Sequence, residues 1–305
     1  MPEIAVSVQA EPRDLDSWLG LARRVEAAGF RGLLAGDHPG SGASPWPALG
    51  SAAAVTSTLT LGTYVVQAGV REPMHVAADA ATLDILAPGR VLLGLGAGHT
   101  PREWEDLGSQ RPAPAGRAGR LAEFTEVVAR LLRGDTVTHE GRYLTLRESR
   151  LDDLPAGGRV RLAVGGGHPQ VLLAAARHAD VVGLSGLGRT LADGHHHEAR
   201  WSLAQLRRQL ELVRDGARSA GRAPVLEALV QVVTVTGDRD ATIEDISRRL
   251  PGAAAGDVAH SPFVLIGSHA AMAAQLRRQA EEFGITSYVV REPAVADLER
   301  VMELL

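Results

Sequence analysis

Short apolar segments alternate with helix-forming segments along the whole chain, and this alternation limits the fold more than any other feature of the sequence. The segments predicted to be strands are 3–9, 32–36, 59–67, 91–95, 160–164, 180–184, 225–236 and 287–290. Repeated strand–helix units indicate a parallel sheet covered by helices, and eight units in 305 residues have the size of a closed (β/α)8 TIM barrel. A doubly wound open sheet is the alternative, because periodicity does not show whether a sheet closes.

Local signals mark where several of the helices begin and end. Asp14 is a typical N-cap for a helix that continues to Ala28 and stops at Gly29, where a left-handed residue costs least. Asp238 and Ser268 are predicted to cap two later helices in the same way.

The alternation is interrupted after the fourth strand. A Pro- and Gly-rich loop at 110–119 precedes a helix over 121–133, and a small hairpin is predicted over 136–144. No linker separates two folding units, so a single domain over residues 1–305 is expected.

Composition excludes several classes of protein. With a net charge of -4 and 32 basic residues scattered among 36 acidic ones, the chain has no basic stripe, and nucleic acid is not an expected partner. No apolar run reaches the ~18 residues of a membrane span, and no signal peptide is recognisable, so a cytoplasmic protein that does not contact a membrane is expected. The chain has no Cys and no Lys, which removes thiolate nucleophiles and Schiff-base chemistry.

The stretch 89–108 combines an apolar strand, a glycine-rich loop and the start of a helix. Gly94, Gly96 and Gly98 have the spacing G-x-G-x-G, but His99 stands where a dinucleotide-binding fingerprint needs its last glycine. A Rossmann site is therefore not supported. The glycines indicate room for a flat group against the end of the strand.

Four polar or glycine-rich loops follow predicted strands, at 37–38, 67–71, 97–105 and 165–169. In a barrel these loops meet at the C-terminal rim, where catalytic groups collect. The imidazoles of His38 and His99 could exchange protons near neutral pH, although a solvent-facing Asp37–His38 pair is the alternative.

Gly165, Gly166 and Gly167 precede a helix, and the unhindered backbone N–H groups at such a position can bind a phosphate. A plain strand-to-helix turn explains the same residues equally well.

The stretch 89–108 also resembles the fourth strand and following loop of the bacterial luciferase-like superfamily, whose members are flavin- and coenzyme F420-dependent TIM barrels. The resemblance covers nearly the whole chain and is closer to the coenzyme F420 branch. It favours the closed barrel, with insertions after strands 4 and 7. It implies an oxidoreductase that transfers a hydride between the deazaflavin of coenzyme F420 and a small organic substrate.

The resemblance also implies roles for individual residues. Asp37 corresponds to the residue that orients the cofactor ring, and His38 or His99 to the acid/base group. Tyr64 and Val65 match the position of a non-proline cis peptide bond that backs the ring. The glycine-rich turn corresponds to the phosphodiester cradle. The implied cofactor-binding residues are Tyr64, Val65, Gln67, Ala97, Gly98, Gly165, Gly166, Gly167 and His168.

The sequence departs from the family pattern in places. His99 stands where several coenzyme F420 enzymes, including sugar-phosphate dehydrogenases, have a catalytic Glu. Glu103 and Glu105 are expected to face solvent, since acidic residues are favoured in a first helical turn. The three histidines 195–197 are predicted to form a lid loop near the substrate, and no metal site is expected.

Two other functions stay open at this point. A monooxygenase that uses reduced FMN and O2 would share the fold, and no residue alone decides between FMN and coenzyme F420. A catalytically lapsed barrel that only binds a flavin or another ligand is the second alternative. Family members are often dimers, so a homodimer supplied by a separate cofactor reductase is expected.

Overall fold

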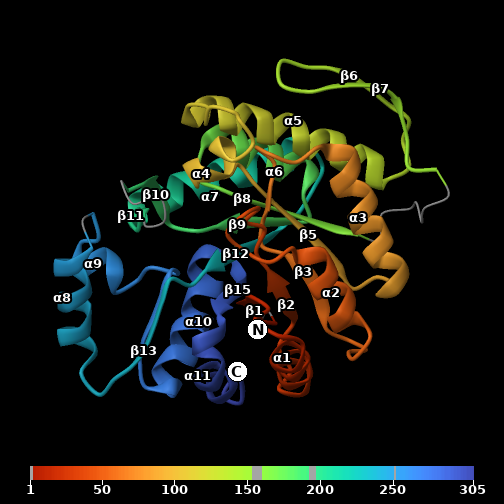
Figure 1. The fold of residues 1–305 in the computed structure, drawn as a ribbon. Helices are drawn as coiled ribbons and strands as arrows, with labels where there is room; N and C mark the ends of the chain where they lie inside the picture. The colour runs from red at the N-terminus through yellow and green to blue at the C-terminus, as the bar shows by residue number, and fades with distance from the viewer. Residues whose placement is uncertain (1–2, 153–159, 192–196, 251) are drawn as a thin grey trace.

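Eight parallel strands close into a barrel in the computed structural model, which describes residues 3–152, 160–191, 197–250 and 252–305 (Figure 1). Closure is shown by the pairing of β1 with both β2 and β15 and by the pairing of β3 with β5. The barrel strands are β1 (Ala5–Ala10), β2 (Gly32–Ala35), β3 (Thr60–Thr63) continued by β4 (Val66–Gln67), β5 (Val91–Gly96), β8 (Arg161–Gly165), β9 (Val181–Leu184), β12 (Val225–Leu229) and β15 (Ile285–Arg291). The predicted TIM barrel is confirmed, and the open sheet is excluded.

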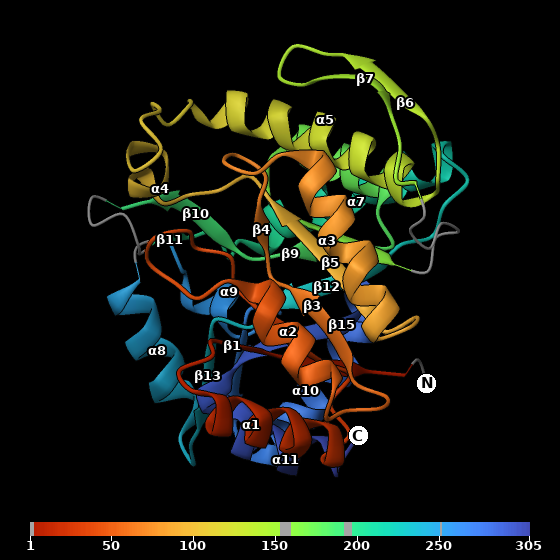
Figure 2. The same cartoon turned by 45° about the vertical axis from the view of Figure 1, so that its right-hand side comes forward.

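Helices surround the barrel on the outside (Figure 2). Those that return the chain from one barrel strand to the next, and the last one, are α1 (Leu15–Ala27), α2 (Pro45–Ala53), α3 (Pro73–Leu86), α5 (Pro114–Leu132), α6 (Pro169–His178), α7 (Leu203–Ser219), α10 (His269–Phe283) and α11 (Val295–Met302). A 3-10 turn, η1 (Glu292–Ala294), precedes α11. The predicted N-caps are confirmed, since the side chains of Asp14, Asp238 and Ser268 each accept a backbone N–H of the helix that follows. α1 ends at Ala27, and Gly29 follows with a φ of +80°.

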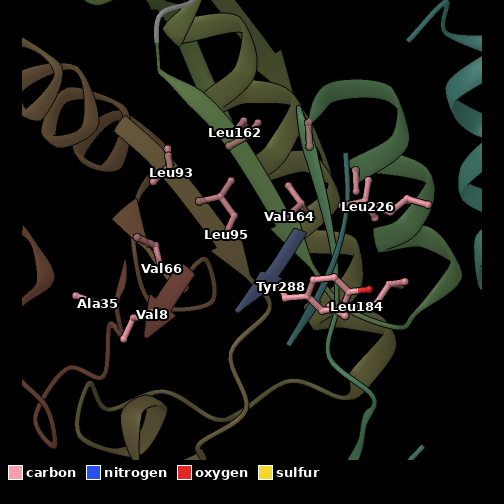
Figure 3. Close-up of a cluster of buried hydrophobic side chains, with 14 of the residues drawn as sticks. Val8, Ala35, Val66, Leu93, Leu95, Leu162, Val164, Leu184, Leu226 and Tyr288 are labelled. Carbon is pink, nitrogen blue, oxygen red and sulfur yellow. The ribbon is translucent and has the colours of Figure 1, made fainter. Parts of the chain in front are cut away.

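Two apolar layers form because alternate strand residues point to opposite faces. Side chains such as Leu93 and Leu95 of β5 and Leu162 and Val164 of β8 belong to the large cluster between strands and helices (Figure 3). A second cluster takes one side chain from each of six strands and therefore fills the inside of the barrel. Its members are Leu34, Leu92, Ala163, Val181, Leu229 and Val289.

The third strand is not continuous over 59–67 as predicted, because the chain breaks between β3 and β4 at a cis peptide bond joining Tyr64 and Val65. Two glycines of β5 leave room for the neighbouring strand at this break. A Cβ on Gly94 would overlap the carbonyl oxygen of Thr63, and a Cβ on Gly96 would overlap a methyl group of Val65. The room that the sequence predicted at these two glycines is thus taken by the neighbouring strand of the protein itself.

Insertions follow the fourth and seventh barrel strands, as the resemblance implied. After β5 come α4 (Pro101–Glu105), α5 and a hairpin of β6 (Val137–Glu140) and β7 (Thr145–Ser149) that projects away from the barrel (Figure 1). The predicted loop 110–119 is wrong in its second half, because α5 begins with Pro114 at a position where proline is well tolerated.

The predicted seventh strand, 225–236, is wrong as a single element. Only β12 lies in the barrel, while β13 (Val232–Val235) pairs in parallel with β14 (Val264–Gly267) in a separate sheet. Gln231 starts this departure, because its backbone N–H bonds to the carbonyl of Phe263 rather than to a barrel strand. The helices α8 (Arg239–Arg249) and α9 (Ala255–Val258) connect β13 to β14.

A short hairpin follows β9 and consists of β10 (Leu187–Thr190) and β11 (His197–Ala199). Within the residues that the structure describes, no helix has the length and apolar character needed to cross a membrane.

Candidate active site

The four polar loops singled out in the sequence all follow C-terminal ends of barrel strands. Residues 37–38 come after β2, 68–71 after β4, 97–105 after β5 and 166–168 after β8. Because all these strands are parallel, the loops lie on one rim of the barrel. Side-chain contacts join the first three loops directly.

Asp37 binds the loop after β4 to the loop after β2. Its side chain is 1% exposed and accepts two hydrogen bonds from Arg71, at 2.7 Å from Nη2 and 3.1 Å from Nε. The backbone N–H of Gln67 donates a third, longer bond at 3.3 Å. The pKa of Arg71 is raised, chiefly by the hydrogen bond to Asp37. The carboxylate is therefore held in one orientation at the rim.

Glu103 is buried against His38, so the expectation that it faces solvent is wrong. His38 Nδ1 lies 2.7 Å from Glu103 Oε1, and the Glu103 side chain is 2% exposed. The hydrogen bond to Glu103 is the main cause that raises the pKa of His38, and burial opposes it. Glu105, at the end of the same short helix α4, is exposed as expected.

Three imidazoles meet at the rim, and we call His38, His99 and His197 the histidine cluster. The ring centroids of His38 and His99 are 5.6 Å apart, and those of His99 and His197 are 4.8 Å apart. His197 reaches this place from the β10–β11 hairpin. Its neighbours His195 and His196, which belong to the predicted lid loop, lie outside the described residues.

Replacing Glu103 by Gln is expected to lower the pKa of His38, because the amide carries no charge to stabilise the imidazolium. The folded-state pKa of His38 is raised above its unfolded value of about 6.5, so the interaction stabilises the protein fully below that value. Its contribution is lost as the pH rises through the folded pKa. The variant should therefore lose more stability at about pH 5.5 than at about pH 9.

Histidine-ring NMR titration measures the pKa, and urea unfolding at the two pH values measures the stability. Glu105→Gln is the matched control, since it removes an exposed carboxylate from the same helix. The same His38 titration midpoint in the wild-type protein and in the Glu103 variant would contradict the assignment of Glu103 as the stabilising group.

A buried carboxyl group lies inside the barrel below the rim, and the sequence analysis missed it. Glu227 of β12 is 2% exposed, and its Oε2 accepts a hydrogen bond from Ser287 Oγ at 2.8 Å. Burial raises the pKa of Glu227. Burial also raises the pKa of Tyr64, and the nearby charge of Glu227 raises it further. The signal available in the sequence was a single acidic residue within the apolar run 225–229.

The glycine-rich turn after β8 is partly open. Gly165 and Gly166 are half-buried, whereas Gly167 and His168 are exposed. A Cβ on Gly165 would have only a carbonyl oxygen at 3.9 Å as its nearest neighbour, so this residue faces open space. The side chain of His168 accepts the Gln170 N–H at 3.3 Å and thereby caps α6.

The side-chain amide of Gln67 has no partner in the part of the chain that the structure describes. The residue is 4% exposed, and neither its side-chain oxygen nor its nitrogen has a hydrogen-bond partner among the described residues. Buried amides are normally paired. The side chain of Gln67 thus holds a donor and an acceptor that no described residue satisfies, and its backbone N–H bonds to Asp37. Within the described ranges, no group of three or more His, Asp or Glu side chains could hold a metal ion.

Comparison with known proteins gives consistent matches. A family model described as "Luciferase-like monooxygenase" matches residues 1–283. An F420-dependent glucose-6-phosphate dehydrogenase of Beutenbergia cavernae is 36% identical over 200 residues, which are 61% of this chain and 57% of that protein. A 4-hydroxyprotoasukamycin monooxygenase of Streptomyces nodosus subsp. asukaensis is also 36% identical, over 48% of this chain and 40% of its own length. These matches span about half the length of the two relatives.

The fold has close counterparts among solved structures. An F420-dependent secondary alcohol dehydrogenase in complex with an F420-acetone adduct superposes with a TM-score of 0.76 at 20% identity, covering 100% of this chain and 98% of that one. At this identity the similarity shows the fold alone.

Proposed function

Because this chain belongs to the luciferase-like monooxygenase family, we propose that it is a coenzyme F420-dependent oxidoreductase acting on a small organic substrate. One observation carries the proposal. The rim holds an imidazole, His38, whose protonated form is stabilised by the buried Glu103. His38 follows β2, and β2 pairs with β3 up to Thr63, the residue before the strand break at Tyr64–Val65. Hydride transfer to or from a substrate carbon needs such a group, since a proton must move at the attached oxygen or nitrogen.

The residues present fit the cofactor. The unpartnered amide of Gln67 would bind the polar edge of a deazaflavin ring, together with Ala97 and Gly98 of the neighbouring loop. Tyr64 and Val65 would form the backing of the ring. When bound, the deazaflavin supplies a carbon that donates or accepts the hydride.

The cofactor's phosphodiester would lie at the turn after β8. Gly165 and Gly166 have no side chains that would block a phosphate at this turn. Gly167 and His168 are exposed and lie at the start of α6. A helix start of this kind favours an anion because its first N–H groups point outward.

In this mechanism His38 moves the proton. Its Nδ1 is engaged by Glu103, so Nε2 is the atom that would donate a proton to the substrate or accept one from it. In the direction of substrate oxidation, His38 in its neutral form would accept the substrate's O–H or N–H proton, while the hydride with its two electrons would pass to the cofactor. The carboxylate of Glu103 then balances the imidazolium charge. His99, whose ring meets that of His38 edge-on at 79°, shapes the substrate side of this site.

Asp37 orients the ring indirectly in this account. Its two carboxylate oxygens are bound by Arg71 and by the backbone of Gln67, so it fixes the residue whose amide would contact the ring. It is a positioning residue.

The test is to titrate the purified protein separately with coenzyme F420 and with FMN while cofactor fluorescence is followed. We expect micromolar binding of coenzyme F420 and binding of FMN that is at least about tenfold weaker. Micromolar binding of FMN alone would indicate a monooxygenase instead, as the Streptomyces relative is named. Binding of neither would indicate a barrel whose chemistry has lapsed. A homodimer and a separate reductase complete the proposal, and light scattering tests the former.

A further inference from the structure

Two arginines near the rim have no carboxylate partner among the described residues, unlike Arg71. Arg111 lies in the loop before α5, and Arg117 lies in the first turns of that helix. Both are half-buried, and the Nε atom of each is buried without an acceptor among the described residues. Within the same part of the chain, no Asp or Glu forms an ion pair with either of them. Half-buried Arg71, in contrast, is paired with Asp37 at 2.7 Å.

The side chain of Arg117 lies beside the segment that holds Arg111, since its Nη1 donates to the carbonyl of Pro112 at 2.7 Å. Burial lowers the pKa of both, and the charge of Arg111 lowers the pKa of Arg117 further. Both remain protonated at neutral pH, because the pKa of a guanidinium group lies far above neutrality. Placing two like charges near each other and partly out of water costs free energy unless an anion compensates them.

Contacts connect this pair to the histidine cluster. Arg111 Nη2 donates to Thr190 Oγ1 at 3.3 Å, and Thr190 is the cross-strand partner of His197 in the β10–β11 hairpin. The His197 ring in turn lies 4.8 Å from that of His99. Figures 1 and 2 both place α4 and the beginning of α5 on the side of the barrel where β10 lies. The pair is therefore at the edge of the proposed active site.

We propose that Arg111 and Arg117 form an anion-binding subsite that takes a phosphate or carboxylate group, carried by the substrate or by the tail of the cofactor. The planar guanidinium fork matches both kinds of group. The N-terminal end of α5, a helix of 19 residues, adds partial positive charge at the same place. The assignment of the anion to substrate or cofactor rests on the proposed function, whereas the binding of an anion does not.

Inorganic phosphate tests the subsite itself. Saturating phosphate, compared with sodium chloride at equal ionic strength, should raise the melting temperature of the wild-type protein by at least about 2 °C. The double variant Arg111→Gln/Arg117→Gln should show less than half of that increase. The Arg111→Lys/Arg117→Lys variant keeps both charges and should recover most of it. Arg23→Gln, which removes an exposed arginine of α1, is the control and should behave as wild type. Equal increases in the wild-type protein and the Gln variant would overturn the proposal.

The source of the anion is distinguished by fluorescence titration of the same variants. Intact coenzyme F420 is compared with the deazaflavin riboside that lacks phosphate and glutamate. If the cofactor tail binds the two arginines, the Gln variant should bind coenzyme F420 at least about tenfold more weakly than the wild-type protein does. Its affinity for the riboside should be unchanged. If the substrate carries the anion, the affinity for both is unchanged while the phosphate effect on melting is still lost. Failure of the wild-type protein to bind either deazaflavin would contradict the proposed function and leave the phosphate result to decide on the subsite.

Discussion

Replacing His38 by Ala is expected to lower the turnover number by about 10²- to 10⁴-fold, the range typical for loss of a general acid or base. The dissociation constant of the cofactor should change far less, because the residues proposed to hold the cofactor, Gln67 and the turn after β8, are untouched. Loss of kcat without loss of binding is the signature of a group that acts in the transition state. Steady-state kinetics and fluorescence titration of the variant measure the two quantities.

His99→Ala extends the same experiment to the second imidazole of the cluster. It should lower turnover less than His38→Ala, since it is the Nδ1 of His38 that lies 2.7 Å from Glu103. His75→Ala removes an exposed imidazole from the first turn of α3 and is the control for loss of a histidine outside the histidine cluster. If both rim variants turn over as the wild-type protein does, the roles given to the histidine cluster are wrong.

Arg71→Met is expected to lower the free energy of unfolding by about 3–5 kcal/mol, because it leaves the buried carboxylate of Asp37 without its counterion. A loss of this size is a large share of the ~5–15 kcal/mol that stabilises a typical protein. The substitution also frees the loop after β4, so cofactor binding should weaken together with stability. Urea unfolding measures the first effect.

Arg24→Met is the matched control for that experiment. Arg24 pairs with Glu299 at 2.8 Å, but its side chain is 52% exposed. Removal of an exposed pair of this kind costs about 1 kcal/mol or less. Equal urea midpoints for the Arg71 and Arg24 variants would show that the Arg71–Asp37 ion pair contributes no more to stability than an exposed ion pair does.

Much of the fold followed from the sequence because the signals are local. Alternating strand and helix segments predicted the barrel, and the N-caps Asp14, Asp238 and Ser268 were placed correctly because capping depends on residues within one helical turn. Closure itself rests on the pairing of β3 with β5, a contact that periodicity does not contain. The division of 225–236 was missed because both halves are apolar and only their different partners separate them.

The site was predicted less completely, since it depends on contacts between distant segments. The burial of Glu103 follows from the docking of α4, in which Trp104 packs close to Gly69 and Gly98 and is 3% exposed. A first-turn acidic residue carries no local sign of such docking. His197 joins His99 only because the β10–β11 hairpin folds back. Asp37, His38 and His99 were recognisable as rim residues because each directly follows a barrel strand or its short loop.

A crystal structure of the protein with coenzyme F420 bound tests the central claim most directly. We expect the deazaflavin ring to lie against Tyr64 and Val65, with His38 beside its reactive carbon and the phosphodiester at Gly165–Gly167. A cavity of about 400 Å³ lies elsewhere, lined by residues of α8 and α10 such as Arg239 and Gln275. A cofactor bound in that cavity, or bound at the rim with its ring turned away from His38, would contradict the account.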